Sequence, residues 1–423
     1  MIDTEAIAER AYDLARRDFS HQFGGPEQGF REKPIWQKVR ALGTRLWLDT
    51  GDIDEAKALW CCEFEALTTN NTLLNREIQK GFYDRFVREV AEAIRRVAPE
   101  IDESRYSPGL VLEIAFVLNA YHALRLVEMF DAHVSVELHT DLGHDVERSV
   151  AYGKRYFDIC PERFYVKVPL TAAGLLAARR LGAEGVPVNF TLGFSARQNY
   201  AAALIAQPRF VNVFMGRLNA FVADNRLGDG RNVGEKATLA AQRMLIGLRD
   251  TGRTRSLLIG ASMREGSQVA ALAGLDVLTM PTKAAAQYED RPAGWLSPQI
   301  DTDPGVPLAD GISFEDFNAA TLWDVPDAFK GCVAGLLDED VDSMTAENVQ
   351  FYFGRHGFED FLPDWSTEDI ETVAADGKIP VLAKWKQRLS RGEIGLDALM
   401  NLSAFEAFAT DQKALDDRIR SLI

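Results

Sequence analysis

The sequence predicts an α/β fold of the (β/α)8 TIM barrel type, in which eight parallel strands alternate with helices. Short runs rich in Val, Ile, Leu, Phe and Thr recur between longer amphipathic stretches, and this alternation is typical of β/α units around a parallel sheet. Eight such runs occur, at residues 44–48, 66–69, 133–138, 164–168, 187–191, 210–213, 256–259 and 277–280. Their span is close to the roughly 250 residues of one barrel.

Length and composition fit one barrel with additions. The chain has 423 residues, and its 47% hydrophobic and 26% charged residues are typical of a soluble globular enzyme rather than a disordered or fibrous chain. The net charge of −16 opposes nucleic acid and anionic membranes, so we expect neither as a partner. The charged N-terminus and the lack of an uninterrupted apolar run near roughly 18 residues favour a cytoplasmic protein.

The barrel is predicted at residues 44–288, preceded by an N-terminal helical extension at 1–43. The extension contains a helix, a Gly- and Pro-rich loop at 21–29 and a second helix near 36–42. Within the barrel, apolar residues that recur every four positions predict one helix with a single apolar stripe, formed by Ile78, Phe82, Phe86, Val90 and Ile94.

Residues 289–397 are an extra segment of different composition. The part at 292–311 is too rich in helix breakers for regular structure. The aromatic residues of the segment are numerous enough to form a small packed lobe or the surface of a homodimer. These residues are Trp295, Trp323, Phe351, Tyr352, Phe353 and Trp365. A cap over the barrel mouth would alter which substrate enters.

Lys167 interrupts the β-branched and aromatic strand FYVKVP and is the first candidate catalytic residue. Burying an ammonium group costs several kcal/mol unless the group is paired or neutral, so a strand lysine is rarely buried without a reason. A buried amine of lowered pKa can attack a carbonyl and form a Schiff base. The alternative is a lysine that extends outward from the strand end into water.

Further polar residues lie at the ends of other predicted strands, where barrel enzymes place their catalytic groups. They are Asp49, Asn70, Glu137, Asn189 and Thr191. Four of them also have a structural explanation: Asp49 as a helix N-cap, Asn70 as a turn residue, Glu137 as the ion-pair partner of Lys167, and Thr191 as an ordinary strand residue.

Two arginines are placed to bind a phosphate. Arg217 follows the sixth predicted strand, and Arg264 follows the seventh, where Ser262 and backbone N–H groups at a helix start would bind an anion. Phosphate sites of barrels often lie near these last loops. Solvated arginines at helix starts are the alternative.

Seven motifs in order resemble those of the transaldolase family, within the Schiff-base aldolase superfamily of (β/α)8 barrels. They are LWLDTGDI, LTTNNTLL, SVEL, YVKVPLTAAGLLAARRL, GVPVNFTLGFSARQ, FVNVFMGRL and LLIGASMREGSQVAALAGLDVLTM. The end of the chain, FATDQKALDDRIRSLI, resembles the C-terminal helix of the family, so residues 398–423 are expected to form a helix that packs on the barrel.

The resemblance implies a transferase of the pentose phosphate pathway that moves dihydroxyacetone from sedoheptulose 7-phosphate or fructose 6-phosphate to an aldose phosphate. Lys167 would form the Schiff base with C2 of the ketose, and Asp49 would accept the proton of the C4 hydroxyl. Glu137 and Thr191 would hold a water that relays protons. Asn70 and Asn189 would hydrogen-bond the hydroxyls of the three-carbon fragment.

At some positions the resemblance points to residues that differ between family members, or to residues of this chain that differ from the usual ones of the family. Phe214 stands where relatives that act as plain aldolases tend to carry Tyr, so it favours transfer over cleavage. Asn212 stands where a Ser usually helps to bind the fragment, which tightens the pocket. Asn71 and Thr72 replace a Pro–Ser pair beside Asn70, and the loss of Pro loosens that turn. His139 is an additional residue without an assigned role.

Two other functions compete with transfer. One is a lyase of the fructose-6-phosphate aldolase type, or an enzyme of the same chemistry with an altered sugar. The other is a barrel that binds sugar phosphates without turnover, which would have no use for a desolvated amine. The six scattered histidines predict no metal site, and no nucleotide-binding motif occurs, so no cofactor is expected.

Overall fold

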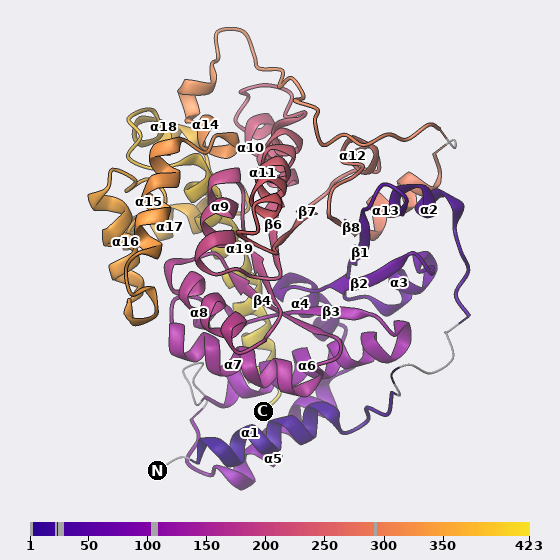
Figure 1. Cartoon of the computed structure of the whole chain (residues 1–423). Helices are drawn as coiled ribbons and strands as arrows, with labels where there is room; N and C mark the ends of the chain where they lie inside the picture. The colour runs from indigo at the N-terminus through magenta and orange to yellow at the C-terminus, as the bar shows by residue number, and fades with distance from the viewer. Residues whose placement is uncertain (1–2, 22, 24–28, 103–108, 292–293) are drawn as a thin grey trace.

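The computed structural model describes residues 3–21, 23, 29–102, 109–291 and 294–423. Its centre is a closed barrel of eight parallel strands in sequential order, the predicted (β/α)8 fold (Figure 1). The strands are β1 Arg45–Asp49, β2 Phe64–Thr68, β3 His133–Glu137, β4 Phe164–Pro169, β5 Val188–Thr191, β6 Phe210–Phe214, β7 Leu257–Ala261 and β8 Val277–Pro281. Each overlaps one of the eight predicted runs.

Strand register brings the polar strand ends together. Glu137 on β3 is paired with Lys167 on β4, which is paired in turn with Asn189 on β5. Asp49 on β1 is paired with Thr68 on β2. Because all strands run parallel, their carboxyl ends open at the same end of the barrel.

Helices surround the barrel between the strands. They are α3 Ile53–Leu59, α4 Asn71–Gln79, α5 Asp84–Val97, α6 Leu110–Phe130, α7 Val146–Ile159, α8 Ala172–Ala183, α9 Ala196–Ile205, α10 Met215–Asp224, α11 Val233–Asp250, α12 Ser267–Ala271 and α13 Thr282–Glu289, with the short 3-10 helix η1 Thr140–Leu142. Before β1, α1 Thr4–Arg16 packs on α5, α6 and α7, and α2 is Pro34–Arg40. The loop predicted at 21–29 lies mostly outside the described residues.

The single helix predicted from Ile78 to Ile94 is wrong. The chain instead ends α4 at Gln79 and starts α5 at Asp84. Gly81 takes a φ of 81°, which a helix does not contain and glycine adopts without steric cost. Phe82 therefore lies in the turn with 79% of its surface exposed, although it fits the spacing of the apolar stripe.

One described helix, α6, is long and apolar enough to cross a membrane by length and composition. Its most apolar 18-residue window has a mean hydropathy of 1.6, but 89% of that window is buried inside the fold. Such burial is typical of the core helix of a large globular protein.

The extra segment forms short helices on one side of the barrel. They are η2 Phe314–Phe317, α14 Ala320–Trp323, α15 Asp327–Leu337, η3 Val341–Ser343, α16 Ala346–Arg355, α17 Thr367–Asp376 and α18 Leu382–Ser390. Phe329 is the centre of their aromatic core, with Phe353, Phe358 and Phe361 within 6.0 Å between ring centroids. Trp295 and Phe351 stay outside this core, since they are 95% and 69% exposed. The described part of 292–311 contains no helix or strand.

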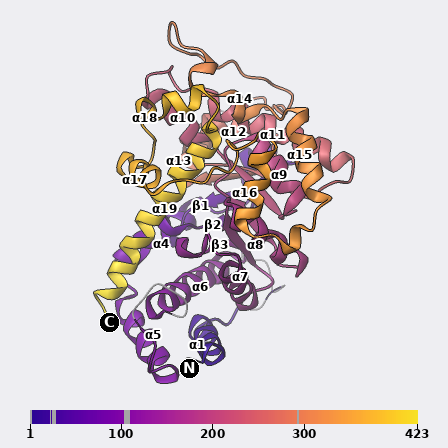
Figure 2. The same ribbon diagram turned by 90° about the vertical axis from the view of Figure 1, so that its left-hand side faces the viewer.

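The last helix, α19 Leu396–Arg420, connects the two regions. Figure 2 shows it running from the extra helices past the barrel to the C-terminus. It packs on α4 and α6 of the barrel and on α14 and α17 of the extra segment. Its first turn is fixed by Asp397, which accepts two hydrogen bonds from the buried Arg197 of α9. The helix thereby brings Phe408 to the mouth of the barrel.

Candidate active site

Lys167 points into the barrel and is only 4% exposed. Its ammonium group donates a hydrogen bond to the carbonyl oxygen of Thr69 at 3.1 Å and lies 3.5 Å from Oε2 of Glu137. The alternative of a lysine extended into water is therefore excluded by its position. A carbonyl and a carboxylate within reach keep the buried amine partnered while leaving it at the base of a pocket.

Asp49 is partly buried and opens onto the same pocket. It is no helix N-cap, because Asp52 caps α3. Its carboxylate instead accepts a hydrogen bond from Thr68 at 3.0 Å, and the Thr68 hydroxyl also lies 2.6 Å from that of Thr279. Burial raises the pKa of Asp49, and the charge of Lys167 opposes that rise.

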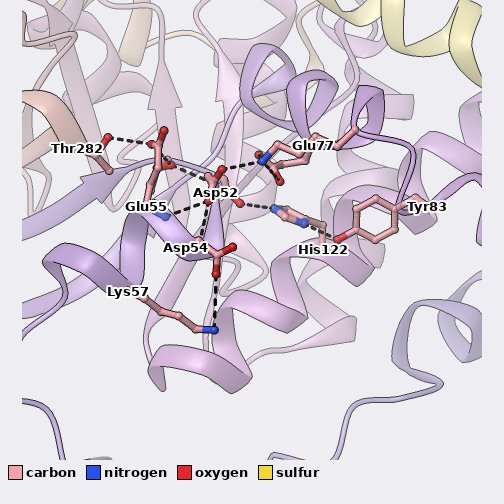
Figure 3. A network of polar contacts seen from close by, with 11 residues as sticks. Asp52, Asp54, Glu55, Lys57, Glu77, Tyr83, His122 and Thr282 are labelled. Atoms are coloured by element: carbon pink, nitrogen blue, oxygen red, sulfur yellow. Dashed lines mark hydrogen bonds and ion pairs between the residues drawn. The ribbon is translucent and has the colours of Figure 1, made fainter.

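The loop after β1, which begins next to Asp49, is held by a hydrogen-bonded network (Figure 3). Nε2–H of His122 on α6 donates to the carbonyl oxygen of Gly51 at 2.8 Å, and Nδ1 accepts from the hydroxyl of Tyr83 at 2.8 Å. Thr282 donates to Glu55 on the other side of the loop. Burial lowers the pKa of His122 to about 4, so the ring is neutral at pH 7 and both hydrogen bonds are satisfied.

Glu137 is fully buried between β3 and β4. In addition to its contact with Lys167, its carboxylate accepts a hydrogen bond from the backbone N–H of Asn71 at 3.3 Å. Burial raises its pKa, while Lys167 and the N–H of Asn71 oppose the rise. A carboxyl group of raised pKa beside an amine suits proton exchange in either direction.

Three polar side chains surround this pair. Asn70 lines the pocket but also caps α4, because its side-chain oxygen accepts from the N–H of Leu73 at 2.9 Å, so the structural explanation for Asn70 holds alongside the functional one. Asn189 donates to the hydroxyl of Ser135 at 2.9 Å. The hydroxyl of Thr191 is buried without a hydrogen-bond partner among the described residues. It does not line the main pocket.

Asn212 and Phe214 form the wall on the side of β6. The side-chain oxygen of Asn212 accepts from the N–H of Gly193 at 3.1 Å, which leaves its NH2 group as the remaining donor. Phe214 packs edge-on against Phe194 and Phe408, with centroids at 5.8 and 6.3 Å. These contacts place an aromatic surface without a hydroxyl in the pocket wall.

Arg217, Ser262 and Arg264 also line the pocket, and together they form its cationic end. Gly216 permits this arrangement, because a Cβ there would lie 2.0 Å from the carbonyl oxygen of Ser262 and 2.8 Å from Nε of Arg264. Arg217 is buried, and its burial together with the charge of Arg264 lowers its pKa to about 10, which still leaves it cationic at pH 7. Two cations side by side without a carboxylate between them suit a bound anion.

The pocket has a volume of about 370 Å³, the size of a small-molecule site. It brings together the candidates Asp49, Asn70, Lys167, Asn189, Asn212, Phe214, Arg217, Ser262 and Arg264. Glu137 reaches it through Lys167.

Known proteins of one family are similar to this chain in sequence. The sequence profile of the Transaldolase/Fructose-6-phosphate aldolase family matches residues 46–310, more than half of the chain. The chain belongs to this family. The transaldolase of Xanthomonas euvesicatoria pv. vesicatoria (strain 85-10) is 29% identical over 284 residues, which are 64% of this chain and 84% of the relative.

Two further relatives also carry the name transaldolase. The protein of Xanthomonas campestris pv. campestris (strain B100) is 31% identical over 243 residues, 55% of this chain and 71% of the relative. The protein of Prochlorococcus marinus subsp. pastoris (strain CCMP1986 / NIES-2087 / MED4) is 25% identical over 302 residues, 69% of this chain and 87% of the relative.

His139, additional to the family motif, lies away from the pocket. Its Nδ1 accepts from the N–H of Asp141 at 3.1 Å, so Nε2 carries the proton and faces the carboxylate of Asp416 on α19 at 3.2 Å. It therefore fastens the end of α19 to the barrel. Among the described residues, no group of His, Cys, Asp and Glu could hold a metal ion.

Sequence reasoning missed several residues that line the pocket. Arg76 and Phe408 are on helices, where no strand-end pattern points to them. Lys378 comes from the extra segment, outside the part of the chain that matches the family. Two signals were available: Arg76 follows Asn70 by six residues on the next helix, and Phe408 opens the C-terminal motif that resembles the family.

Proposed function

We propose that the protein is a transaldolase that transfers a dihydroxyacetone unit between sugar phosphates through a Schiff base on Lys167. The observation that carries the proposal is the buried amine of Lys167, which contacts Glu137 at the base of a pocket that also contains Asp49. A site that only binds sugars gains nothing from burying an amine, because the desolvation has to be offset.

In the first step, the ammonium group of Lys167 passes a proton to Glu137, and the resulting neutral amine adds to C2 of a ketose phosphate such as sedoheptulose 7-phosphate or fructose 6-phosphate. Glu137 donates a proton to the departing hydroxyl, water leaves, and a protonated imine remains. The raised pKa of Glu137 supports this role, since burial favours a carboxyl group that carries a proton when one is needed. Thr191 would hold the water through which the proton passes.

In the second step, Asp49 accepts the proton of the C4 hydroxyl. The C3–C4 bond breaks, its electron pair moves to the imine to give an enamine, and the aldose phosphate leaves. Asn70, Asn189 and Asn212 hydrogen-bond the hydroxyls of the fragment. A second aldose phosphate then enters, C3 of the enamine attacks its carbonyl carbon, and water releases the new ketose from Lys167.

Phe214 supports transfer over simple cleavage. A lyase must protonate the enamine to release free dihydroxyacetone, and this requires a proton donor near C3. The ring of Phe214, held by Phe194 and Phe408, offers none at this wall. The aldolase reaction, or the same chemistry on a different sugar, remains the second candidate. The reaction needs no cofactor and suits a cytoplasmic enzyme of the pentose phosphate pathway.

Reduction with borohydride tests the Schiff base. The protein is incubated with fructose 6-phosphate and reduced, and the masses of the intact chain and of the peptide with Lys167 are read. We expect a stable adduct the size of dihydroxyacetone on Lys167 in the wild type and none in Lys167→Ala. An adduct on another residue, or none with any ketose phosphate, would contradict the proposal.

Release of free dihydroxyacetone separates the two candidate reactions. With fructose 6-phosphate and a four-carbon aldose phosphate, a transaldolase forms a seven-carbon ketose phosphate much faster than it releases free dihydroxyacetone. A lyase releases dihydroxyacetone at the same rate with or without the acceptor.

A further inference from the structure

One residue of the extra segment lines the pocket. Lys378, in the turn between α17 and α18, lines the pocket together with Arg217 and Arg264. The match to the family ends at residue 310, so the family resemblance does not account for this residue.

The turn that carries Lys378 has a defined shape. Gly377 before it takes φ 83° and ψ −132°, a conformation open mainly to glycine. The carboxylate of Asp376 accepts from the N–H of Val381 at 2.9 Å and pairs with the ammonium of Lys384. These contacts between the two sides of the turn fix its shape.

The turn is also fastened to the barrel next to the arginine site. Asn225, which follows α10, donates to the carbonyl oxygen of Pro380 at 3.0 Å and accepts from the N–H of Leu382 at 2.8 Å. Because Arg217 is on the same helix α10, the turn and the guanidinium group are held by one element.

Lys378 contacts Arg217 directly through its backbone. Its carbonyl oxygen accepts from Nη1 of Arg217 at 2.9 Å and from the hydroxyl of Ser403 at 3.2 Å. Within the described ranges of the chain, this is the one hydrogen bond that the guanidinium group makes. The carbonyl orients the group, and its other N–H donors stay available to a ligand.

The charges at this end of the pocket are unbalanced. Lys378 is exposed, and neither it nor Arg217 or Arg264 forms an ion pair with any described residue. Asp411 is the carboxylate whose charge acts on Arg217, and it accepts a hydrogen bond from the hydroxyl of Thr72. Three cationic residues that line one pocket without an ion-pair partner among the described residues fit a ligand with a dianionic group.

We propose that Lys378 is a specificity-determining residue that the extra segment adds to this site. Its ammonium group binds the phosphate of the sugar together with Arg217 and Arg264, and its carbonyl oxygen holds Arg217 in position. The inference rests on the proposed function for the reaction, but it concerns only how the anion is bound.

Lys378→Met in the full chain tests this, because methionine keeps the length of the stem and removes the charge. We expect KM for fructose 6-phosphate to rise on the order of tenfold, the loss of one charge-assisted hydrogen bond, with little change in kcat. The inhibition constant of inorganic phosphate should rise by the same factor, and KM for unphosphorylated fructose should not change.

Lys283→Met is the matched control. Lys283 is an exposed lysine on α13 beside Thr282, which lines the pocket, whereas Lys283 does not. Lys283→Met changes the net charge by the same amount as Lys378→Met, so it measures the general loss of attraction for anions. Equal effects of the two substitutions, or an equal rise in KM for phosphorylated and unphosphorylated substrates, would overturn the proposal.

Binding of inorganic phosphate, measured by calorimetry, separates the two proposals because it requires no turnover. Weaker binding to Lys378→Met than to Lys283→Met supports the role of Lys378 even if no adduct forms on Lys167. Turnover with equal phosphate affinity in both variants refutes the role of Lys378 and leaves the proposed reaction intact. A wild type that does not bind phosphate refutes the role as well.

Discussion

The two ends of the pocket differ in how their charges are balanced. At the base, Lys167 faces Glu137 at 3.5 Å and exerts its charge on Asp49, so opposite charges neutralise one another. At the cationic end, neither Arg217 nor Arg264 forms an ion pair with a described residue, although the charge of Asp411 acts on Arg217 and that of Asp49 on Arg264. The base can exchange protons without any ligand, whereas the cationic end has guanidinium groups without ion-pair partners, which a bound anion would supply.

Asp49→Asn changes the base of the pocket and is expected to have the largest effect on activity. The amide cannot accept the proton of the C4 hydroxyl, so we expect kcat to fall by roughly 10² to 10⁴. Since burial raises the pKa of Asp49, its charge is unfavourable in the folded state at neutral pH, and the free energy of unfolding should stay the same or rise. Steady-state kinetics and urea unfolding at pH 7 measure both. A variant that is equally active, or that is inactive because it unfolds, would contradict the assignment.

Arg217→Met tests the cationic end. Without the guanidinium group, phosphate binding should weaken by about 10- to 100-fold, while the adduct on Lys167 still forms at high substrate concentration. Because Arg217 is a buried cation next to Arg264, its removal should also cost little stability without phosphate. Inorganic phosphate should raise the Tm of the wild type but not that of the variant. Equal Tm shifts in both proteins would place the anion elsewhere.

His122→Gln acts at the loop beside Asp49, where the expected effect is on stability rather than on catalysis or phosphate binding. The folded pKa of His122, about 4, lies below the ordinary 6.5, so between these values the unfolded chain binds a proton that the folded chain does not. Stability should therefore fall as the pH drops through this window, by roughly 3 kcal/mol in total. Glutamine can still donate to the carbonyl oxygen of Gly51 and does not titrate.

Urea unfolding of the wild type and of His122→Gln at pH 7 and pH 5 measures how much stability each protein loses on acidification. The loss of stability on acidification should be smaller in His122→Gln than in the wild type. The same loss in both proteins would show that other groups titrate instead.

The sequence predicted the pocket residues on or just after the strands better than those that helices and the extra segment bring to it. Strand-end residues such as Lys167 and Glu137 are fixed by a period of two and by strand order, both of which are local signals. The helix predicted across Gly81 failed because a turn interrupted a spacing that otherwise fits one helix. Lys378 could not be predicted, since its approach to Arg217 depends on the packing of a turn 161 residues later in the chain.

The position of α19 has a consequence for the order of events during synthesis. The eighth strand is complete at Pro281, yet Lys378 and Phe408, which finish the pocket, follow roughly 100 residues or more later. At about 5 to 20 residues per second, a ribosome needs on the order of ten seconds to make that stretch. A nascent chain can thus close its barrel, with Lys167 already inside, well before the pocket that selects its substrate exists.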